Sequence, residues 1–158
     1  MSAPGQPAAR GGTPSDRGPV QHVVFLVDAT RYALPLSSVS QVVLQPDGLV
    51  RVPRAPAPVL GVVNIRGRVV TVVDFALLLD LPPPAQPQRK LILLERGRRD
   101  LALSVTDVEG FESVEKVSSQ ARESRAPVRG VTRVKGAAVT VLDADALDIA
   151  VTRLFDRG

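Results

Sequence analysis

The sequence predicts an all-β fold built from two small barrels, and three observations lead to this prediction. Valine, leucine, isoleucine and alanine supply nearly all the apolar residues, while aromatic residues are scarce, and a valine-rich composition favours β-structure. The chain also repeats itself at a fixed shift. Within each copy, short apolar runs alternate with polar or glycine-containing turns, which is typical of hairpins.

The internal repeat becomes visible when the sequence is shifted by 69 positions against itself. The segment 61–78, "GVVNIRGRVVTVVDFALL", then falls without a gap on 130–147, "GVTRVKGAAVTVLDADAL". The same shift places 23–39 on 92–108. Since one shift aligns both segments, the chain contains two copies of one unit. A unit this small buries a sheet face only if it closes into a barrel or packs on its twin, so two barrels side by side are expected.

The segments outside the repeat are expected to be tails and a linker. Residues 1–20 mix proline, glycine, serine and alanine without an apolar run, so we expect a disordered tail and no signal peptide. The copies, about 21–80 and 90–149, are joined by the proline-rich segment 81–88, because proline interrupts both helices and strand pairing. Residues 151–158 are expected to form a C-terminal tail.

Each copy is predicted to contain two hairpins and a short helix. In the first copy, a polar turn at 28–31 and a glycine turn at 66–68 connect the strands, and glycine supplies a positive φ without steric cost. An aspartate followed by an apolar stretch then predicts a helix with that aspartate as N-cap. This explains both repeated aspartates better than a pair of catalytic carboxylates does. The structural residues marked by the repeat are Gly61, Asp74, Gly130, Gly136 and Asp143.

Residues suited to catalysis are few. The chain has no cysteine, which excludes disulfides, thiolate nucleophiles and cysteine-ligated metals. The single histidine, His22, has Leu91 as its repeat partner, so a strand-edge or half-buried structural role is favoured over catalysis. Ser37, Ser38 and Ser104 lack an identifiable base. We therefore expect no enzyme, no metal and no cofactor.

A phosphate cradle and a nucleic-acid site are the next alternatives. The glycines of "GVVNIRGRVV" bracket a hairpin and do not open a helix, so they do not match phosphate-binding loops. The basic segment 89–99 could bind nucleic acid, but a solvated hairpin edge is favoured because few aromatic residues could stack on bases. These exclusions favour a protein-binding module.

The segment 52–79, "VPRAPAPVLGVVNIRGRVVTVVDFALLL", resembles the signature of the CheW-like coupling domain of bacterial chemosensory systems. Three further landmarks follow the family in order: "VVFLVDATRYALPLSSVSQVV", "ALSVTDVEGFESVEKV" and "VRGVTRVKGAAVTVLDADAL". The resemblance covers about residues 21–150. It implies two small five-stranded SH3-like barrels related by pseudo-twofold symmetry, with short helices after the barrel strands.

The resemblance also implies a function, that of a non-catalytic adaptor in the cytoplasm, recruited to receptor arrays at the inner membrane. Its expected partners are the regulatory domain of a CheA-type histidine kinase, the cytoplasmic tip of a methyl-accepting chemoreceptor and other CheW-like proteins, with no nucleic acid and no membrane insertion. An adaptor outside flagellar chemotaxis stays open as an alternative, and a basic nucleic-acid-binding barrel is a weaker one.

Two motifs of the family carry the expected contacts. The V-x-E-I segment and the N-L-R-G turn match, by position, the partner-binding residues Val39, Gln41, Val42, Asn64, Arg66 and Gly67. Arg66 is the first candidate, because a guanidinium on a rigid turn offers a planar donor fork. Its alternative role is an internal contact with residue 41, where glutamine replaces the family's glutamate and removes the charge-assisted part of that contact.

Other departures from the family pattern, one of them inside a strand, cluster on expected surfaces and loops more than on core positions. They are Thr71, Ser104 and Thr106, and they leave the predicted fold intact while leaving the choice of partner open. Near the V-x-E-I segment, the apolar run Val42, Val43 and Leu44 offers candidates for exposed contacts. Burial in a strand explains any one of these three equally well.

Overall fold

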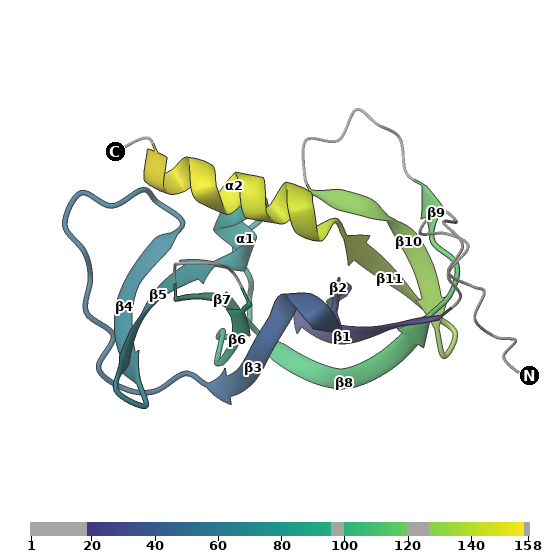
Figure 1. Cartoon of the computed structure of the whole chain (residues 1–158), viewed down its shortest axis with the longest axis horizontal. Helices are drawn as coiled ribbons and strands as arrows, with labels where there is room; N and C mark the ends of the chain where they lie inside the picture. The colour runs from purple at the N-terminus through teal and green to yellow at the C-terminus, as the bar shows by residue number, and fades with distance from the viewer. Residues whose placement is uncertain (1–18, 96–99, 120–126, 157–158) are drawn as a thin grey trace, which may run out of the picture.

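The computed structural model describes residues 19–95, 100–119 and 127–156, and it shows two β-sheets packed side by side. The predicted tail at 1–20 lies outside these residues except at its end, where the first strand already begins at Val20. Part of the basic segment, 96–99, is also outside them. The predicted all-β fold is confirmed (Figure 1).

Eleven strands and two α-helices follow one another along the described residues. Their bounds are β1 Val20–Val27, β2 Thr30–Pro35, β3 Val39–Leu44, β4 Val59–Ile65, β5 Arg68–Asp74, α1 Phe75–Leu78, β6 Lys90–Leu94, β7 Leu101–Val105, β8 Asp107–Val114, β9 Ser118–Ser119, β10 Val128–Val134, β11 Ala137–Leu142 and α2 Ala144–Asp156. A short 3-10 turn, Leu36–Ser38, connects β2 to β3.

The strands form two barrels, and each barrel contains strands from both sequence copies. Barrel 1 has the strand order β3-β6-β7-β5-β4, and barrel 2 has the order β8-β1-β2-β11-β10-β9. The first hairpin of each copy therefore leaves its own copy and pairs with strands of the other. Parallel pairing makes this exchange possible, since β5 lies beside β7 and β11 lies beside β2.

The pairing registers of the two barrels obey the same shift of 69 positions as the sequence. Val72 pairs with Ala102 across the parallel contact in barrel 1. The shifted residues, Val141 and Ala33, pair across the parallel contact in barrel 2. The one strand without a full counterpart is β9, whose place in barrel 1 is taken by an isolated bridge at Val50. The pseudo-twofold symmetry therefore extends to individual backbone partners.

The largest apolar core lies between the barrels, and smaller cores fill each interior. Phe25, Tyr32 and Phe75 form the aromatic centre of the shared core, with ring centroids 5.0–5.8 Å apart. Separate aliphatic clusters occupy barrel 1 and barrel 2. Because aromatic side chains bury large areas, three rings in contact make the interface between the barrels a major source of stability.

The two predicted N-caps lie where the sequence places them. The Oδ1 of Asp74 accepts a hydrogen bond from the Leu77 amide, and the Oδ1 of Asp143 accepts one from the Ala146 amide. The predicted C-terminal tail at 151–158 is wrong, because α2 continues to Asp156. The helix is also longer than the short helix predicted after the last strand. Its apolar residues, including Val151, pack against the shared core, and this burial stabilises the helix beyond the end of the repeat.

The proline-rich linker is fastened to the turn between β1 and β2. The carboxylate of Asp28 accepts hydrogen bonds of 2.9 Å from the Ala85 and Gln86 amides. The Asp28 amide in turn donates to Oγ1 of Thr106, which is one of the departures from the family pattern. Asp28 thus joins three segments that lie far apart in the sequence.

Candidate partner-binding site

The turn between β4 and β5 carries the predicted Arg66 motif in a fixed conformation. Arg66 and Gly67 have φ values of 53° and 85°, and two successive positive values are typical of a tight hairpin turn that follows the strand twist. Arg68 belongs to β5, so the turn is shorter than predicted. The Oδ1 of Asn64 accepts a hydrogen bond of 2.9 Å from the Gly67 amide. Asn64 therefore closes the turn, a role its match to the family motif does not reveal.

Arg66 is exposed at the tip of this hairpin. Within the described part of the chain it takes part in no ion pair or hydrogen bond. A free guanidinium held on a rigid turn can donate two parallel hydrogen bonds to a carboxylate. Because the turn is already ordered, little backbone entropy would be lost on binding.

Gln41 and Arg66 line the same pocket, of about 250 Å³, at the open end of barrel 1. No hydrogen bond joins the two side chains among residues 19–95, so the expected internal contact is not formed. Arg68 instead pairs with Asp100 across the pocket. The complete lining is Ser40, Gln41, Ile65, Arg66, Arg68, Val70, Leu93, Leu94, Glu95, Asp100 and Leu101.

The valines of the V-x-E-I segment contribute to packing more than to the surface. Val39 and Val42 are half-buried and pack against the shared core, whereas Val43 packs against the core of barrel 1. Of the three apolar candidates in this run, Leu44 is the exposed one, with 68% of its surface accessible. β3 is nevertheless an edge strand of barrel 1, so its outer backbone edge is available to a partner strand.

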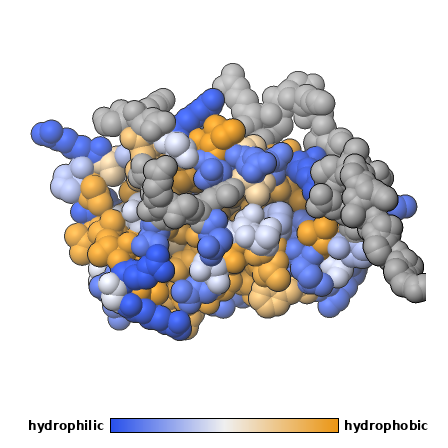
Figure 2. Space-filling model, viewed as in Figure 1, coloured by the Kyte–Doolittle hydropathy of each residue, from blue (hydrophilic) through white to orange (hydrophobic). Residues whose placement is uncertain are grey.

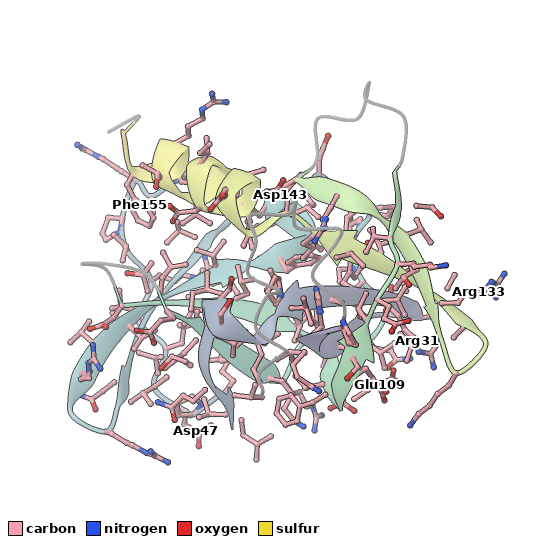
Figure 3. All side chains as sticks on the ribbon, turned by 45° about the vertical axis from the view of Figure 1, so that its right-hand side comes forward. Arg31, Asp47, Glu109, Arg133, Asp143 and Phe155 are labelled. Atoms are coloured by element: carbon pink, nitrogen blue, oxygen red, sulfur yellow. The ribbon has the colours of Figure 1, made fainter. Side chains whose placement is uncertain are left out.

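Barrel 2 contains the equivalent pocket, of about 510 Å³, but its cations are paired internally. Lys135 is the repeat partner of Arg66, and its Nζ lies 3.2 Å from Oε2 of Glu112. Arg31 donates two hydrogen bonds, of 2.8 and 3.1 Å, to Glu109 (Figure 3), and this contact raises the pKa of the Arg31 guanidinium. The two pockets therefore lie at equivalent places in the two barrels. They differ because Arg66 in barrel 1 has no partner among the described residues, whereas Lys135 and Arg31 in barrel 2 are paired with glutamates.

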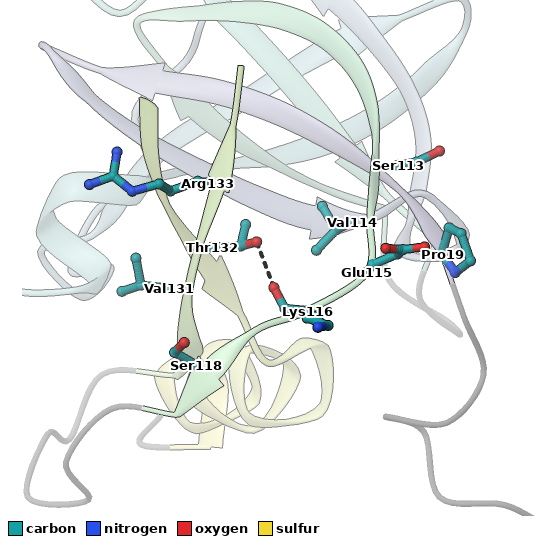
Figure 4. A pocket seen from close by; sticks show the side chains of 9 residues that line it. All are labelled: Pro19, Ser113, Val114, Glu115, Lys116, Ser118, Val131, Thr132 and Arg133. Atoms are coloured by element: carbon teal, nitrogen blue, oxygen red, sulfur yellow. Dashed lines mark hydrogen bonds between the residues drawn. The ribbon is translucent and has the colours of Figure 1, made fainter. Parts of the chain in front are cut away.

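A third groove, of about 650 Å³, opens between β8 and β10 in barrel 2 (Figure 4). Oγ1 of Thr132 donates a hydrogen bond of 2.6 Å to the Lys116 carbonyl across it. None of the residues selected from the family motifs lies in this groove, so it lies apart from the predicted site.

Two of the residues considered for catalysis, His22 and Ser104, are buried, whereas Ser37 is exposed and Ser38 is half-buried. His22 is buried rather than half-buried, and its Nδ1 lies 2.8 Å from the Val20 carbonyl oxygen, while Nε2 has no partner among the described residues. Burial lowers the pKa of His22 by more than the Val20 contact raises it. Oγ of Ser104 is likewise buried without a described partner. Over residues 19–95, 100–119 and 127–156 no cluster of potential metal ligands occurs.

Among the helices in the described part of the chain, none has the length and apolar character needed to cross a membrane.

Comparisons with known proteins agree with the fold and with the family that the sequence resembles. The family model for the CheW-like domain matches residues 21–150. The chemotaxis protein CheW of Helicobacter pylori is 31% identical over 83 residues, covering 52% of this chain and 50% of that protein. A probable chemotaxis protein CheW of Rhizobium etli is 29% identical over 105 residues, covering 60% of this chain and 66% of that protein.

A solved structure supports the same architecture. The scaffolding protein TtCheW from Thermoanaerobacter tengcongensis superposes with a TM-score of 0.69 at 19% identity, over 78% of this chain and 88% of that one. At this identity the likeness shows the fold. Together with the family match over most of the sequence, it leads to one conclusion: the chain belongs to the CheW-like domain family.

Proposed function

We propose that this protein is a non-catalytic chemosensory adaptor that couples a CheA-type histidine kinase to the cytoplasmic tip of a methyl-accepting chemoreceptor. One observation carries the proposal: the chain belongs to the CheW-like family and presents an unpaired arginine on the rigid turn of the family motif. The names of its relatives, which are chemotaxis proteins, support this role. Other CheW-like proteins are further partners of the same kind.

In this proposal Arg66 is the residue that recognises the kinase. Its guanidinium is exposed, has no described partner and is held on an ordered hairpin. An arginine in this situation can bind a carboxylate or exposed carbonyls of a partner without first breaking an internal contact. The neutral Gln41 in the same pocket leaves that charge available.

The other motif residues act in support of Arg66. Asn64 and Gly67 hold the turn, Val39 and Val42 anchor the edge strand β3, and Gln41 offers an amide next to the arginine. This division follows from their burial and hydrogen bonds. The adaptor acts in the cytoplasm and is recruited to receptor arrays at the inner membrane by its partners.

A calorimetric titration tests this proposal. The protein is titrated with the CheW-like regulatory domain of a CheA-type kinase from the same genome, at two salt concentrations, and compared with Arg66→Glu. Circular dichroism first establishes that both proteins are folded. We expect wild type to bind and Arg66→Glu to lose at least about tenfold in affinity, because a charge reversal at a docking site adds repulsion.

The outcome separates adaptor function from fold. Failure of the folded wild type to bind any such kinase domain would reject coupling and leave an interaction module of the same fold outside chemotaxis. Equal binding by wild type and Arg66→Glu would retain the adaptor and remove Arg66 from its interface.

A further inference from the structure

The two sequence copies are joined by one connection, the segment 79–89 between α1 and β6, which contains the proline-rich linker. The strand pairs between the copies are β1 with β8, β2 with β11, β3 with β6 and β5 with β7. Each of these pairs takes one strand from each copy, and its hydrogen bonds do not involve the linker. The second copy of another molecule can therefore supply the same pairs in the same registers, which is the requirement for domain swapping.

The linker contributes little buried surface to the molecule. Its exposed residues are Pro82, Pro83, Ala85, Gln86 and Pro87. At the start of the linker, the Leu81 amide donates a hydrogen bond of 2.8 Å to the Ala76 carbonyl, and the Leu81 side chain packs against the shared core. Because an exposed segment can change its path without uncovering a core, the part of the linker after Leu81 is suited to act as a hinge.

Asp28 determines the path of this hinge. In the described part of the chain, the exposed linker residues are hydrogen-bonded to the barrels through the Asp28 carboxylate, which accepts bonds of 2.9 Å from the Ala85 and Gln86 amides. While these amides are held, only residues 87–89 precede β6, and a segment of that length reaches at most about 11 Å. Released from Asp28, the whole segment 79–89 reaches up to about 40 Å. The Asp28 contact therefore keeps β6 within its own molecule.

The shared core requires strands from both copies. Phe25 and Tyr32 of the first copy lie in this core together with Leu101 and Leu103 of the second. A first copy by itself leaves these side chains uncovered, so the second copy of another molecule competes with the chain's own second copy during folding. No apolar surface patch is needed for this contact. Figure 2 shows apolar and hydrophilic side chains interspersed over the face of both barrels that it presents.

We infer that this chain exchanges its second copy with a second molecule of itself, and that the Asp28 contact with the linker favours the monomer. In the exchanged dimer, each pair of barrels combines β1–β5 of one chain with β6–β11 of the other, and the shared core is rebuilt unchanged. The two forms differ in the linker, and the dimer is favoured at high chain concentration by mass action. The exchange does not depend on the proposed function. With that function, a dimer carrying two Arg66 turns would bind two partners at once.

The absence of cysteine from the chain allows the exchange to be trapped with engineered disulfides. Gln21 of β1 is paired with Ser113 of β8, both are exposed, and Nε2 of Gln21 donates a hydrogen bond of 2.9 Å to Oγ of Ser113. Directly paired residues have Cβ atoms about 4.5–5.5 Å apart, close to the geometry of a disulfide. Gln21→Cys and Ser113→Cys are therefore made in separate chains, which are mixed, unfolded in urea, refolded together at low and high protein concentration, and oxidised.

The product measured is the disulfide between the two different chains, which mass spectrometry distinguishes from disulfides between like chains. A mixture of Gln21→Cys with Ile149→Cys measures random cross-linking, because Ile149 is 53% exposed but lies on α2. Circular dichroism checks that every refolded mixture is folded.

The role of Asp28 is tested by preparing the same mixtures with a second substitution. Asp28→Gly removes both acceptor oxygens, and glycine tolerates the φ of 57° at this position. Asp28→Asn, which keeps one acceptor, is the milder variant. Asp47→Gly is the matched control, because Asp47 is exposed and takes part in no hydrogen bond or ion pair among the described residues.

At high concentration we expect the mixed disulfide to exceed random cross-linking by at least about fivefold. Asp28→Gly should raise its yield at least about threefold, because two hydrogen bonds to a carboxylate are lost. Asp28→Asn should lie between, and Asp47→Gly should leave the yield unchanged. A mixed disulfide at the random level, in folded mixtures with and without Asp28→Gly, would overturn the exchange. Equal yields with and without the folded Asp28 variants would overturn the role of Asp28. Since no partner domain is used, a failure of kinase coupling affects neither result.

Discussion

The two barrels differ in the charge pairing of residues that occupy equivalent positions in the repeat. Arg66 and Lys135 occupy equivalent positions, with φ values of 53° and 51°, yet Lys135 is paired with Glu112 and Arg66 has no partner among the described residues. The cause is local, because the acidic side chains have different partners: Asp100 in the Arg66 pocket is paired with Arg68, whereas Glu112 in the other pocket is paired with Lys135. Charge pairing at single positions therefore gives two equivalent turns different capacities for binding.

A glutamate at position 41 should form an ion pair with Arg66. Gln41→Glu places a carboxylate in the pocket that Arg66 already lines, and an exposed ion pair of this type contributes about 0.2–1 kcal/mol. Binding to the kinase regulatory domain should weaken by roughly two- to fivefold, because the internal pair must open first. Calorimetry at low and high salt checks this, and the loss should shrink at high salt, where the pair is screened. Gln41→Asn, which adds no charge, is the control, and a tighter-binding Gln41→Glu would contradict the prediction.

Stability should fall at mildly acidic pH because of His22. Its pKa in the folded protein is lowered by burial, so the unfolded chain, with an ordinary value of about 6.5, binds the proton more readily. The stabilising effect is therefore fully present above about pH 6.5 and is lost as the pH falls from there toward the lower folded-state pKa. Urea unfolding at pH 7.5 and pH 5.5 measures the difference.

The matched variant for this prediction is His22→Leu, which copies the repeat partner Leu91. It removes both the titrating group and the buried Nε2 that has no described partner, so we expect about 1 kcal/mol of added stability at pH 5.5. A His22→Leu protein with the same pH dependence as wild type would place the titration elsewhere.

At the scale of elements, one glycine in each barrel allows a neighbouring chain segment to approach its strand closely. A Cβ on Gly61 would lie 2.3 Å from the Val50 carbonyl oxygen, and a Cβ on Gly130 would lie 2.2 Å from the Ser118 carbonyl oxygen. Because glycine has no Cβ, Gly61 leaves room for the isolated bridge in barrel 1, and Gly130 leaves room for β9 in barrel 2. The repeated glycine thus marks a close approach of two chain segments.

Gly61→Ala should destabilise the protein by about 3 kcal/mol or more, since it adds a backbone clash to a strained φ of 151°. Gly136→Ala is the matched control, because its φ is also positive but nothing lies within 4 Å of the added Cβ, so about 1–2 kcal/mol is expected. Chemical denaturation of the two variants gives the comparison. Equal losses of stability in the two variants would mean that the positive φ, and not the close contact, is the reason for glycine at position 61.

At the scale of the whole molecule, the interleaving of the two copies makes the barrels depend on one another. Barrel 1 needs β6 and β7 from the second copy, and barrel 2 needs β1 and β2 from the first. The aromatic core between the barrels contains Phe25 and Phe75, which extend from different barrels. A chain organised in this way is expected to unfold as one cooperative unit.

Separated halves should therefore fail to fold alone. Fragment 1–88 lacks β6 and β7 of barrel 1 and four strands of barrel 2. Fragment 89–158 lacks three strands of barrel 1 and β1 and β2 of barrel 2, and the missing hydrogen-bond partners leave open edges. Circular dichroism of each fragment should show little β-structure, and an equimolar mixture should regain it and elute as a complex on size-exclusion chromatography. A fragment that is folded and monomeric alone would show that one copy closes its own barrel.

The sequence by itself determined the repeat, the hairpins, the caps at Asp74 and Asp143 and the family, because these depend on local spacing and on turn chemistry. It also selected the Arg66 turn. Only the tertiary structure decided that each barrel draws strands from both copies, that α2 continues to Asp156, and that His22 is fully buried. It also decided that Val50 and Val69 are exposed. Each of these features depends on which distant segments of the chain meet. The alternation of side chains along a strand predicts which residues lie on the same face, but it does not predict which segment covers that face.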